Sequence, residues 1–128
     1  MANRRENVVV VDDDLGMNRA IENLLDAAGF RALTFRSGEA LLESGAAASA
    51  ACVVLDVHLD GLSGFELRRR LLQAGSTAPV IFITAYEDPG TRAEAQNVGA
   101  HAFFIKPFPG RHFLDAITAA VSSYEGED

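Results

Sequence analysis

The sequence predicts an α/β domain in which a parallel sheet carries helices on both faces. Strand and helix patterns alternate five times along the chain. Four of the strand patterns are short and wholly apolar, as expected for parallel strands that helices cover on both sides. These runs are Val8–Val11, Cys52–Leu55, Val80–Ile83 and Ala102–Ile105, and each is followed directly by a polar residue. Alternating strands and helices produce right-handed crossovers within one sheet.

The composition is that of one globular domain. Of the 128 residues, 48% are hydrophobic and 23% are charged, which argues against a disordered chain. No apolar stretch approaches the roughly 18 residues of a membrane span, and the N-terminal residues lack the apolar core of a signal peptide. The net charge of −7 argues against direct nucleic-acid binding and favours basic partners or divalent cations. Cys52, the single cysteine, is expected to be a small buried side chain in a cytoplasmic protein.

The first half of the chain provides three strands and two helices. The helix after the first strand is predicted from apolar residues at helical spacing, namely Met17, Ile21, Leu24, Leu25 and Ala28. We expect Asp14 to cap its start and Gly29 to end it. Arg31–Phe35 mixes apolar and polar residues, which indicates a more exposed edge strand. Ser37 can cap a short second helix, and a loop of small residues follows at 45–51.

The second half of the chain provides the remaining helices. Ser63 and Glu66 form a capping-box pattern for a helix that ends at Gly75. The apolar stripe of this helix is Phe65, Leu67, Leu71 and Leu72. Its run of three arginines, Arg68, Arg69 and Arg70, is expected to face solvent, and a docking patch is the alternative. Residues 86–90 are expected to form a loop. Thr91–Val98 is predicted to be a helix with a weak apolar stripe, and therefore the least firmly held.

The C-terminal end of the chain is predicted from its apolar spacing. The last helix carries Phe113, Leu114, Ile117 and Val121 on one face. Residues 123–128 are polar, so we expect one domain at 1–122, followed by a frayed tail or the start of a linker.

Three aspartates are expected to converge at the carboxyl edge of the sheet. Asp12 and Asp13 follow the first strand, and Asp56 ends the third. Ligands of open α/β sheets bind beyond this edge. Two carboxylates about 4 Å apart repel by roughly 4 kcal/mol at an effective dielectric constant near 20, so the cluster requires a compensating cation. Mg²⁺ (or Mn²⁺) is the natural candidate, because such ions prefer oxygen ligands.

The polar residues after the other apolar runs extend this site. Asp56 is a candidate nucleophile, since a carboxylate can attack phosphorus to form an aspartyl phosphate. Thr84 and Lys106 could donate to the transferred oxygens and neutralise their charge. A threonine at a strand end is usually only a strand residue, and a lysine before proline is usually solvated. Their joint occurrence at successive strand ends favours a phosphoryl-transfer site.

In these motifs the chain resembles a receiver domain of a two-component response regulator over essentially its whole length. The matching segments are Val11–Asp14, Leu55-Asp56, Gly61–Gly64, Phe82–Ala85, Gly99-Ala100 and Phe103–Phe108. The resemblance implies a flavodoxin-like, doubly wound five-stranded sheet in strand order 2-1-3-4-5. It also implies a phosphoprotein of phosphorelay signal transduction.

The resemblance assigns roles to the acidic residues. Asp56 would accept a phosphoryl group from a histidine kinase or a phosphotransfer protein. Asp13, Asp56 and the backbone carbonyl of His58 would bind Mg²⁺. Asp12 would act on the same ion largely through water.

The resemblance also implies a switch. Thr84 and Lys106 would contact the phosphoryl group, and Phe103 occupies the position of the family's switch aromatic. The Lys106-Pro107 peptide bond would be cis. Phosphorylation would draw Thr84 inward, let Phe103 fill the vacated space, and alter the surface formed by Thr91–Val98, the last strand and the last helix. A partner would read that surface, and a second copy of the chain is one candidate.

Two features depart from the usual pattern of the family. Asp60 stands where proline is common, and it adds negative charge near the site. His58 and Tyr86 occupy the two rim positions that tune the phosphoryl lifetime in the family. A bulky pair there could crowd the attacking water, so we expect slow autodephosphorylation.

Other interpretations fit the residues less well. A haloacid-dehalogenase-like phosphatase needs an aspartate two residues after its nucleophile, where this chain has His58. A dinucleotide-binding domain needs a glycine-rich loop where this chain has Asp12–Asp14, and a flavin module would place its phosphate against three acids. The remaining alternative is a receiver-like interaction module that acts without phosphorylation. Whether the chain counts as an enzyme is left open, because it would catalyse its own phosphorylation and dephosphorylation but act mainly as a signalling switch.

Overall fold

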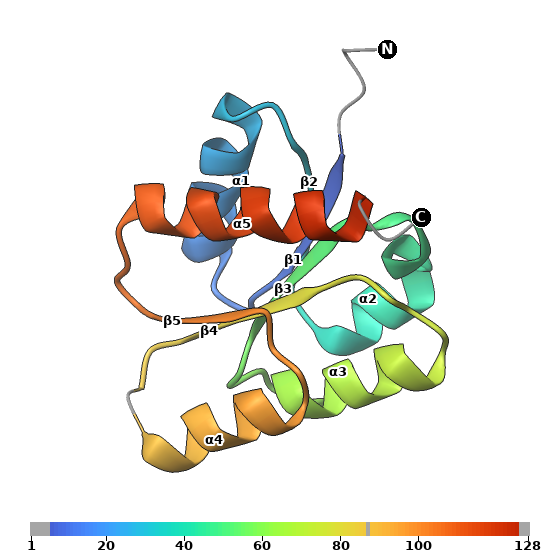
Figure 1. The fold of residues 1–128 in the computed structure, drawn as a ribbon. Coiled ribbons are helices and arrows are strands. Elements are labelled where there is room, and N and C mark those ends of the chain that lie inside the picture. Colours follow the sequence, from blue (N-terminus) through green and yellow to red (C-terminus); the bar gives the residue numbers. More distant parts are fainter. Residues whose placement is uncertain (1–5, 87, 126–128) are drawn as a thin grey trace.

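A computed structural model describes residues 6–86 and 88–125, which form a five-stranded parallel sheet with helices on both faces (Figure 1). The strands are β1 (Asn7–Val11), β2 (Arg31–Phe35), β3 (Cys52–Asp56), β4 (Val80–Thr84) and β5 (Ala102–Ile105). The helices are α1 (Leu15–Ala27), α2 (Gly38–Ser44), α3 (Gly64–Gln73), α4 (Pro89–Asn97) and α5 (Gly110–Glu125), with a 3₁₀ turn, η1 (Ala46–Ser49), after α2. The strand order is β2-β1-β3-β4-β5. The predicted fold class and strand order are therefore confirmed.

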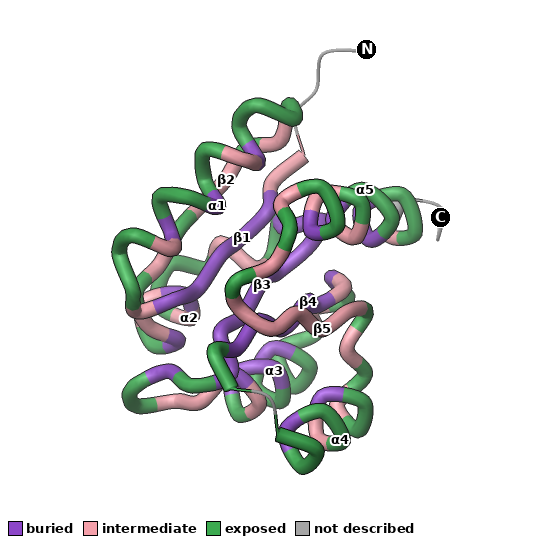
Figure 2. The backbone as a smooth tube through the Cα atoms, turned by 90° about the vertical axis from the view of Figure 1, so that its left-hand side faces the viewer, coloured by how far each residue is buried: buried purple, intermediate pink, exposed green. Residues whose placement is uncertain are grey.

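The helices form two layers, one on each side of the sheet. α1 and α5 cover one face, while α2, α3 and α4 cover the other (Figure 1). Successive side chains of a strand point to opposite faces. Val8 and Val10 accordingly pack with α1 and α5, whereas Val9 and Val11 pack with the other layer. The central strands β1, β3 and β4 are almost wholly buried, and the edge strands β2 and β5 are less so (Figure 2).

Local signals determine where α1 and α3 begin and where α1 ends. The Asp14 carboxylate accepts hydrogen bonds from two N–H groups in the first turn of α1. Ser63 and Glu66 form the expected capping box at the start of α3. Gly29 follows α1 with a φ of +92°, as expected of a residue that ends a helix. These three predictions are confirmed.

α4 begins earlier than predicted. It starts at Pro89 rather than at Thr91, because the Asp88 side chain accepts a hydrogen bond from the Gly90 N–H and so caps the helix there. Proline suits the first turn, where its missing N–H has no helical partner in any case. Only Thr91 and Ala95 of this helix are buried, so the expectation of a weakly buried helix is confirmed.

Two further boundaries differ from the sequence prediction. The small-residue segment at 45–51 is not wholly a loop, since Ala46–Ser49 forms the turn η1. α5 continues to Glu125, so residues 123–125 are helical, and residues 126–128 lie outside the described residues.

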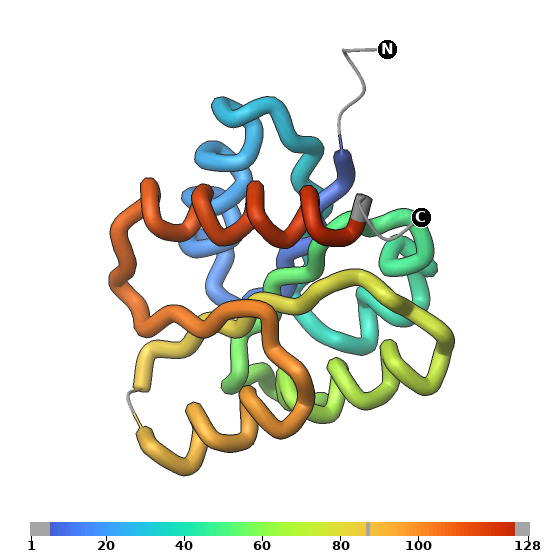
Figure 3. Tube along the Cα trace, in the orientation of Figure 1, coloured from blue at the N-terminus to red at the C-terminus, as the bar shows by residue number. Residues whose placement is uncertain are grey.

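Figure 3 follows the chain from β4 through α4 and β5 to α5, which places the last two helices on opposite sides of the sheet. No helix among the described residues is both long and apolar enough to cross a membrane.

α3 differs from its predicted burial at two positions. Arg68 does not face solvent; it is 9% exposed, and its side chain donates to the carbonyl oxygens of Val98 at 3.1 Å and Ala78 at 3.4 Å. Burial lowers the pKa of its guanidinium. Leu72 is 48% exposed, so it does not belong to the buried stripe. The other two arginines of the run are exposed, as predicted.

Cys52 is fully buried in β3, as predicted. Burial raises the pKa of its thiol to about 12. The side chain therefore behaves as a small apolar group of the core at neutral pH.

Candidate functional site

The register of the sheet brings the strand-end residues to one edge. Val11 of β1 pairs with Leu55 of β3, so the residues that come next, Asp12 and Asp56, lie at the same level of the sheet. Asp56 pairs with Ile83 of β4, and Thr84 pairs with Ile105 of β5. Thr84 and Lys106, the residues that follow Ile83 and Ile105, therefore lie at the same edge. Four residues that are far apart in the sequence are thus placed together by strand pairing alone.

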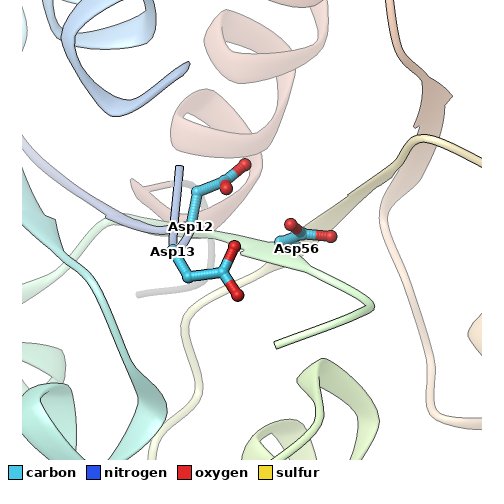
Figure 4. A group of neighbouring side chains, drawn as sticks. All are labelled: Asp12, Asp13 and Asp56. Carbon is cyan, nitrogen blue, oxygen red and sulfur yellow. The ribbon is translucent and has the colours of Figure 1, made fainter. Parts of the chain in front are cut away.

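Asp12, Asp13 and Asp56 form a compact acidic cluster at this edge (Figure 4). Each offers a carboxylate oxygen within 4.8 Å of those of the other two. Asp12 is fully buried and Asp56 is 5% exposed. Burial is the main reason why the pKa of Asp12 is raised. Hydrogen bonds from Lys106 and Asp14 oppose that shift, and the charge of Asp56 adds to it.

Lys106 links two of these acids. Its Nζ lies 2.7 Å from Oδ2 of Asp12 and 3.3 Å from Oδ2 of Asp56. Burial alone would lower the pKa of this ammonium, but the hydrogen bond to Asp12 and the charges of both acids outweigh burial and raise it. Its backbone N–H donates to the carbonyl of Thr84 at 2.7 Å, and the bond to Pro107 is cis, as expected. Lys106 is therefore a charged, anchored group inside the site.

The cluster has the charge and the donor atoms that suit a divalent cation. Counted formally, three carboxylates and one ammonium carry a charge of −2. Mg²⁺ and Mn²⁺ prefer carboxylate and carbonyl oxygens. The N–H of His58 donates to Oδ1 of Asp56 at 3.1 Å, so the main chain of residue 58 lies beside the acids. The residues present therefore fit such an ion.

The rim of the site is formed by two aromatic rings and a buried hydroxyl. Thr84 is fully buried, and its Oγ1 accepts the N–H of Tyr86 at 3.2 Å. The rings of His58 and Tyr86 meet edge to face, with centroids 5.0 Å apart, although Tyr86 is 63% exposed. Asp60 is exposed and does not join the acidic cluster within the described part of the chain.

Phe103 connects the site to α4. It is half-buried on β5 and packs against the core beneath α2, α3 and α4. The guanidinium carbon of Arg92, on α4, lies 4.9 Å from the centroid of its ring. A cation over an aromatic face is attracted by the ring's negative potential, so α4 and Phe103 are physically coupled.

Two residues of the site have contacts that the sequence interpretation did not assign, although Gly64 belongs to one of the matching segments. Asn18, on α1, donates from its side-chain amide to the carbonyl oxygens of Asp12 and Phe35. Gly64 lies so close to the end of β3 that a Cβ atom there would be 2.3 Å from the carbonyl oxygen of Asp56. Asn18 falls three residues before Ile21, on the buried face of the helix, and this spacing was the available signal.

Comparisons with known proteins agree with this geometry. A family model described as "Response regulator receiver domain" matches residues 8–118. Nodulation protein W of Bradyrhizobium diazoefficiens is 37% identical over 119 residues, which are 93% of this chain and 52% of that protein. This chain spans about half the length of the curated relatives it matches.

Solved structures give the same result. A structure of response regulator StyR superposes with a TM-score of 0.88 at 35% identity, covering 96% of this chain and 62% of that one. A response regulator receiver protein from Burkholderia phymatum superposes with a TM-score of 0.81 at 43% identity, covering 92% and 96% of the two chains.

Proposed function

The chain belongs to the response regulator receiver domain family of two-component systems, and we propose that Asp56 is its phosphoacceptor. The donor would be the phosphohistidine of a histidine kinase or a phosphotransfer protein. The position of Lys106 supports this proposal most, because its ammonium lies 2.7 Å from Asp12 and 3.3 Å from Asp56. A fixed ammonium at this point would balance the charge of phosphoryl oxygens delivered to Asp56.

In the proposed reaction, a carboxylate oxygen of Asp56 attacks the phosphorus of the phosphohistidine. An O–P bond forms to give an acyl phosphate while the P–N bond breaks, and the electron pair of that bond returns to the histidine nitrogen. Positioning and charge neutralisation provide most of the catalysis in such transfers. Asp13, Asp56 and the His58 carbonyl would hold Mg²⁺ or Mn²⁺, and Asp12 would act on it through water. When bound, the ion supplies further positive charge to the transferred oxygens.

The switch would begin at Thr84. Its Oγ1, which accepts the Tyr86 N–H at 3.2 Å, would turn to donate to a phosphoryl oxygen. Lys106 would contact another of these oxygens. Phe103 would then fill the space that Thr84 leaves, and the guanidinium of Arg92 over its ring would transmit the change to α4.

The surface formed by α4, β5 and α5 would be the part that a partner reads, and a second copy of the chain is one candidate partner. Shifting the equilibrium between two conformations from about 1:99 to 99:1 requires that the phosphoryl group favour one of them by roughly 5.5 kcal/mol. α4 buries only Thr91 and Ala95, so little apolar area opposes its displacement. Direct nucleic-acid binding is not expected of this segment, given its net charge of −7. A cytoplasmic location stays a prediction.

The aromatic rim would lengthen the life of the phosphoryl group. The rings of His58 and Tyr86, 5.0 Å apart, would crowd the path of the attacking water. Asp60, which stands where proline is common in the family, is the second departure and adds a negative charge to the loop after β3. Decay of the phosphorylated protein at the same rate in His58→Ala, Tyr86→Ala and wild type would contradict this role of the rim.

Incubation with Mg²⁺ and acetyl phosphate, followed by intact-mass measurement, tests the proposed function. The protein should gain one phosphoryl group, and Asp56→Asn or removal of the metal by a chelator should abolish the gain. Asp60→Asn is the matched control, because it removes an exposed acid outside the cluster and should leave the gain intact. A folded wild-type protein that gains no mass would instead support an interaction module that acts without phosphorylation.

A further inference from the structure

Asn18 is a polar residue on the buried face of α1, where it is 3% exposed. Its side-chain Nδ2 donates to the carbonyl oxygen of Asp12 at 2.8 Å and to that of Phe35 at 3.1 Å. The Phe35 carbonyl also accepts the N–H of Asp12 at 3.1 Å. The amide of Asn18 therefore joins the carboxyl ends of β1 and β2 directly before the acidic cluster.

The bond to Asp12 restrains the peptide group that connects the two adjacent acids. A peptide group is planar, so holding the carbonyl of Asp12 sets the direction in which the chain continues to Asp13. The side chain of Asp12 is separately held by Lys106 at Oδ2 and by the N–H of Asp14 at Oδ1. Asn18 thus adds the main-chain anchor from which Asp13 projects toward the cluster.

The unpaired oxygen of Asn18 indicates that the amide is retained for its donors. Oδ1 is buried and has no hydrogen-bond partner within residues 6–86 and 88–125. An unpaired buried acceptor lowers stability, whereas both bonds of the amide nitrogen are directed at carbonyl oxygens. Neither a carboxylate nor an apolar side chain could satisfy these two carbonyls.

We infer that Asn18 is a positioning residue for the acidic cluster, so that the cation affinity of the cluster and the rate of phosphorylation at Asp56 both depend on it. The second effect rests on the proposed function, whereas cation binding can be measured by itself. Removing a group that orients metal ligands typically weakens metal affinity about 10- to 100-fold.

The test compares two substitutions on the same helix. Asn18→Leu keeps the number of side-chain heavy atoms and removes both donors. With Mn²⁺ as the probe, titration by electron paramagnetic resonance should show affinity at least about 10-fold weaker than in wild type. The amide hydrogens of residues 13 and 14 should also exchange faster. Ile21→Val is the control: it shortens a buried apolar side chain of the same face of α1, removes no hydrogen-bond donor, and should leave both readouts unchanged.

Asn18→Ser provides a second variant in case Asn18→Leu does not fold. Its hydroxyl has one proton and cannot donate to both carbonyls, so Mn²⁺ affinity should again fall. Wild-type affinity and exchange in folded Asn18 variants would overturn the inference. Weaker Mn²⁺ binding in the variants, with no phosphoryl gain even in wild type, would uphold the effect on cation affinity and contradict the proposed function. A wild-type protein that binds no Mn²⁺ would overturn both.

Discussion

The helices α1 and α4 are attached to the same sheet by different kinds of contact. α1 buries Ile21 and Leu25 almost completely in the core shared with α5, whereas α4 buries only Thr91 and Ala95. Burying a large aliphatic side chain contributes about 1.5–3 kcal/mol, and the smaller area of an alanine contributes less. α1, the helix that begins beside the acidic cluster, is therefore held by apolar packing, whereas little apolar packing holds α4.

Arginine side chains hold α4 in place instead. Arg68 of α3 donates to a carbonyl at the C-terminal end of α4, and Arg69 of α3 forms an ion pair with Glu94. Arg92 of α4 lies over the ring of Phe103 on β5. Regions with few buried apolar contacts open at lower free energy than the core. The end of the domain that carries the acidic cluster is therefore firmly packed, whereas α4 is attached mainly by polar contacts.

The largest difference should appear when each helix loses a side chain. Leu25→Ala should lower the free energy of unfolding by about 2–5 kcal/mol, as expected for a leucine truncated in a core. Val98→Ala, at the half-buried C-terminal end of α4, should cost about 1 kcal/mol or less. Denaturation by urea measures both values. Equal losses would mean that α4 is packed as firmly as α1.

Cys52 can report the opening of the α1 and α5 layer, because it is fully buried beneath them. Its thiol has a pKa raised by burial to about 12, so at neutral pH a thiol reagent should label it only after this layer opens. Leu25→Ala should speed labelling about 30-fold or more, the equivalent of 2 kcal/mol. Above pH 9.0 the thiol ionises only in the unfolded chain, so stability should fall as pH rises toward 12. Rapid labelling of the wild-type protein would show that this layer is not firmly packed.

Arg68→Ala should release the C-terminal end of α4. The substitution removes a donor from the carbonyls of Val98 and Ala78, at a cost of about 1–3 kcal/mol. Hydrogen exchange followed by mass spectrometry should show a larger loss of protection in α4 than in α1. Arg70→Ala, which removes an exposed arginine of α3, should leave the protection of both α4 and α1 unchanged. Equal loss of protection in both helices would contradict a separate attachment of α4.

The smallest effect should come from the ion pair on the surface. The side chains of Arg69 and Glu94 are 49% and 34% exposed, so Glu94→Gln should cost about 0.2–1 kcal/mol at low salt. The cost should disappear at about 1 M salt, where exposed charges are screened within roughly 3 Å. Urea denaturation at two salt concentrations measures this difference, and a cost independent of salt would point to packing rather than charge.

The fold and the acidic site follow from local patterns in the sequence. Apolar runs predict buried strands, and the polar residue after each run reaches the same edge once the strands are parallel. The caps at Asp14 and Ser63 are equally local. The start of α4 had a local signal as well, in Asp88-Pro89, but the weak apolar stripe of that helix obscured it.

The burial of Arg68 could not be predicted in this way. Its two neighbours in the run of arginines carry the same charge and remain exposed. What distinguishes Arg68 is its acceptor, the carbonyl of Val98, which lies 30 residues later in the chain. Arg68 lies three residues before Leu71, so helical spacing places it beside the buried face, as for Asn18. The packing of α3 against α4 supplies its acceptor, and no pattern within α3 indicates that partner.

Arg68 also gives the attachment of α4 a dependence on temperature. Its guanidinium is 9% exposed, and none of the ion pairs among the described residues includes it. The hydration of a charged group carries a strongly negative entropy, so the cost of removing that group from water falls as temperature rises. Apolar packing gains little further stability over the same interval. Warming therefore strengthens the contact between Arg68 and α4 relative to the apolar packing that holds α1.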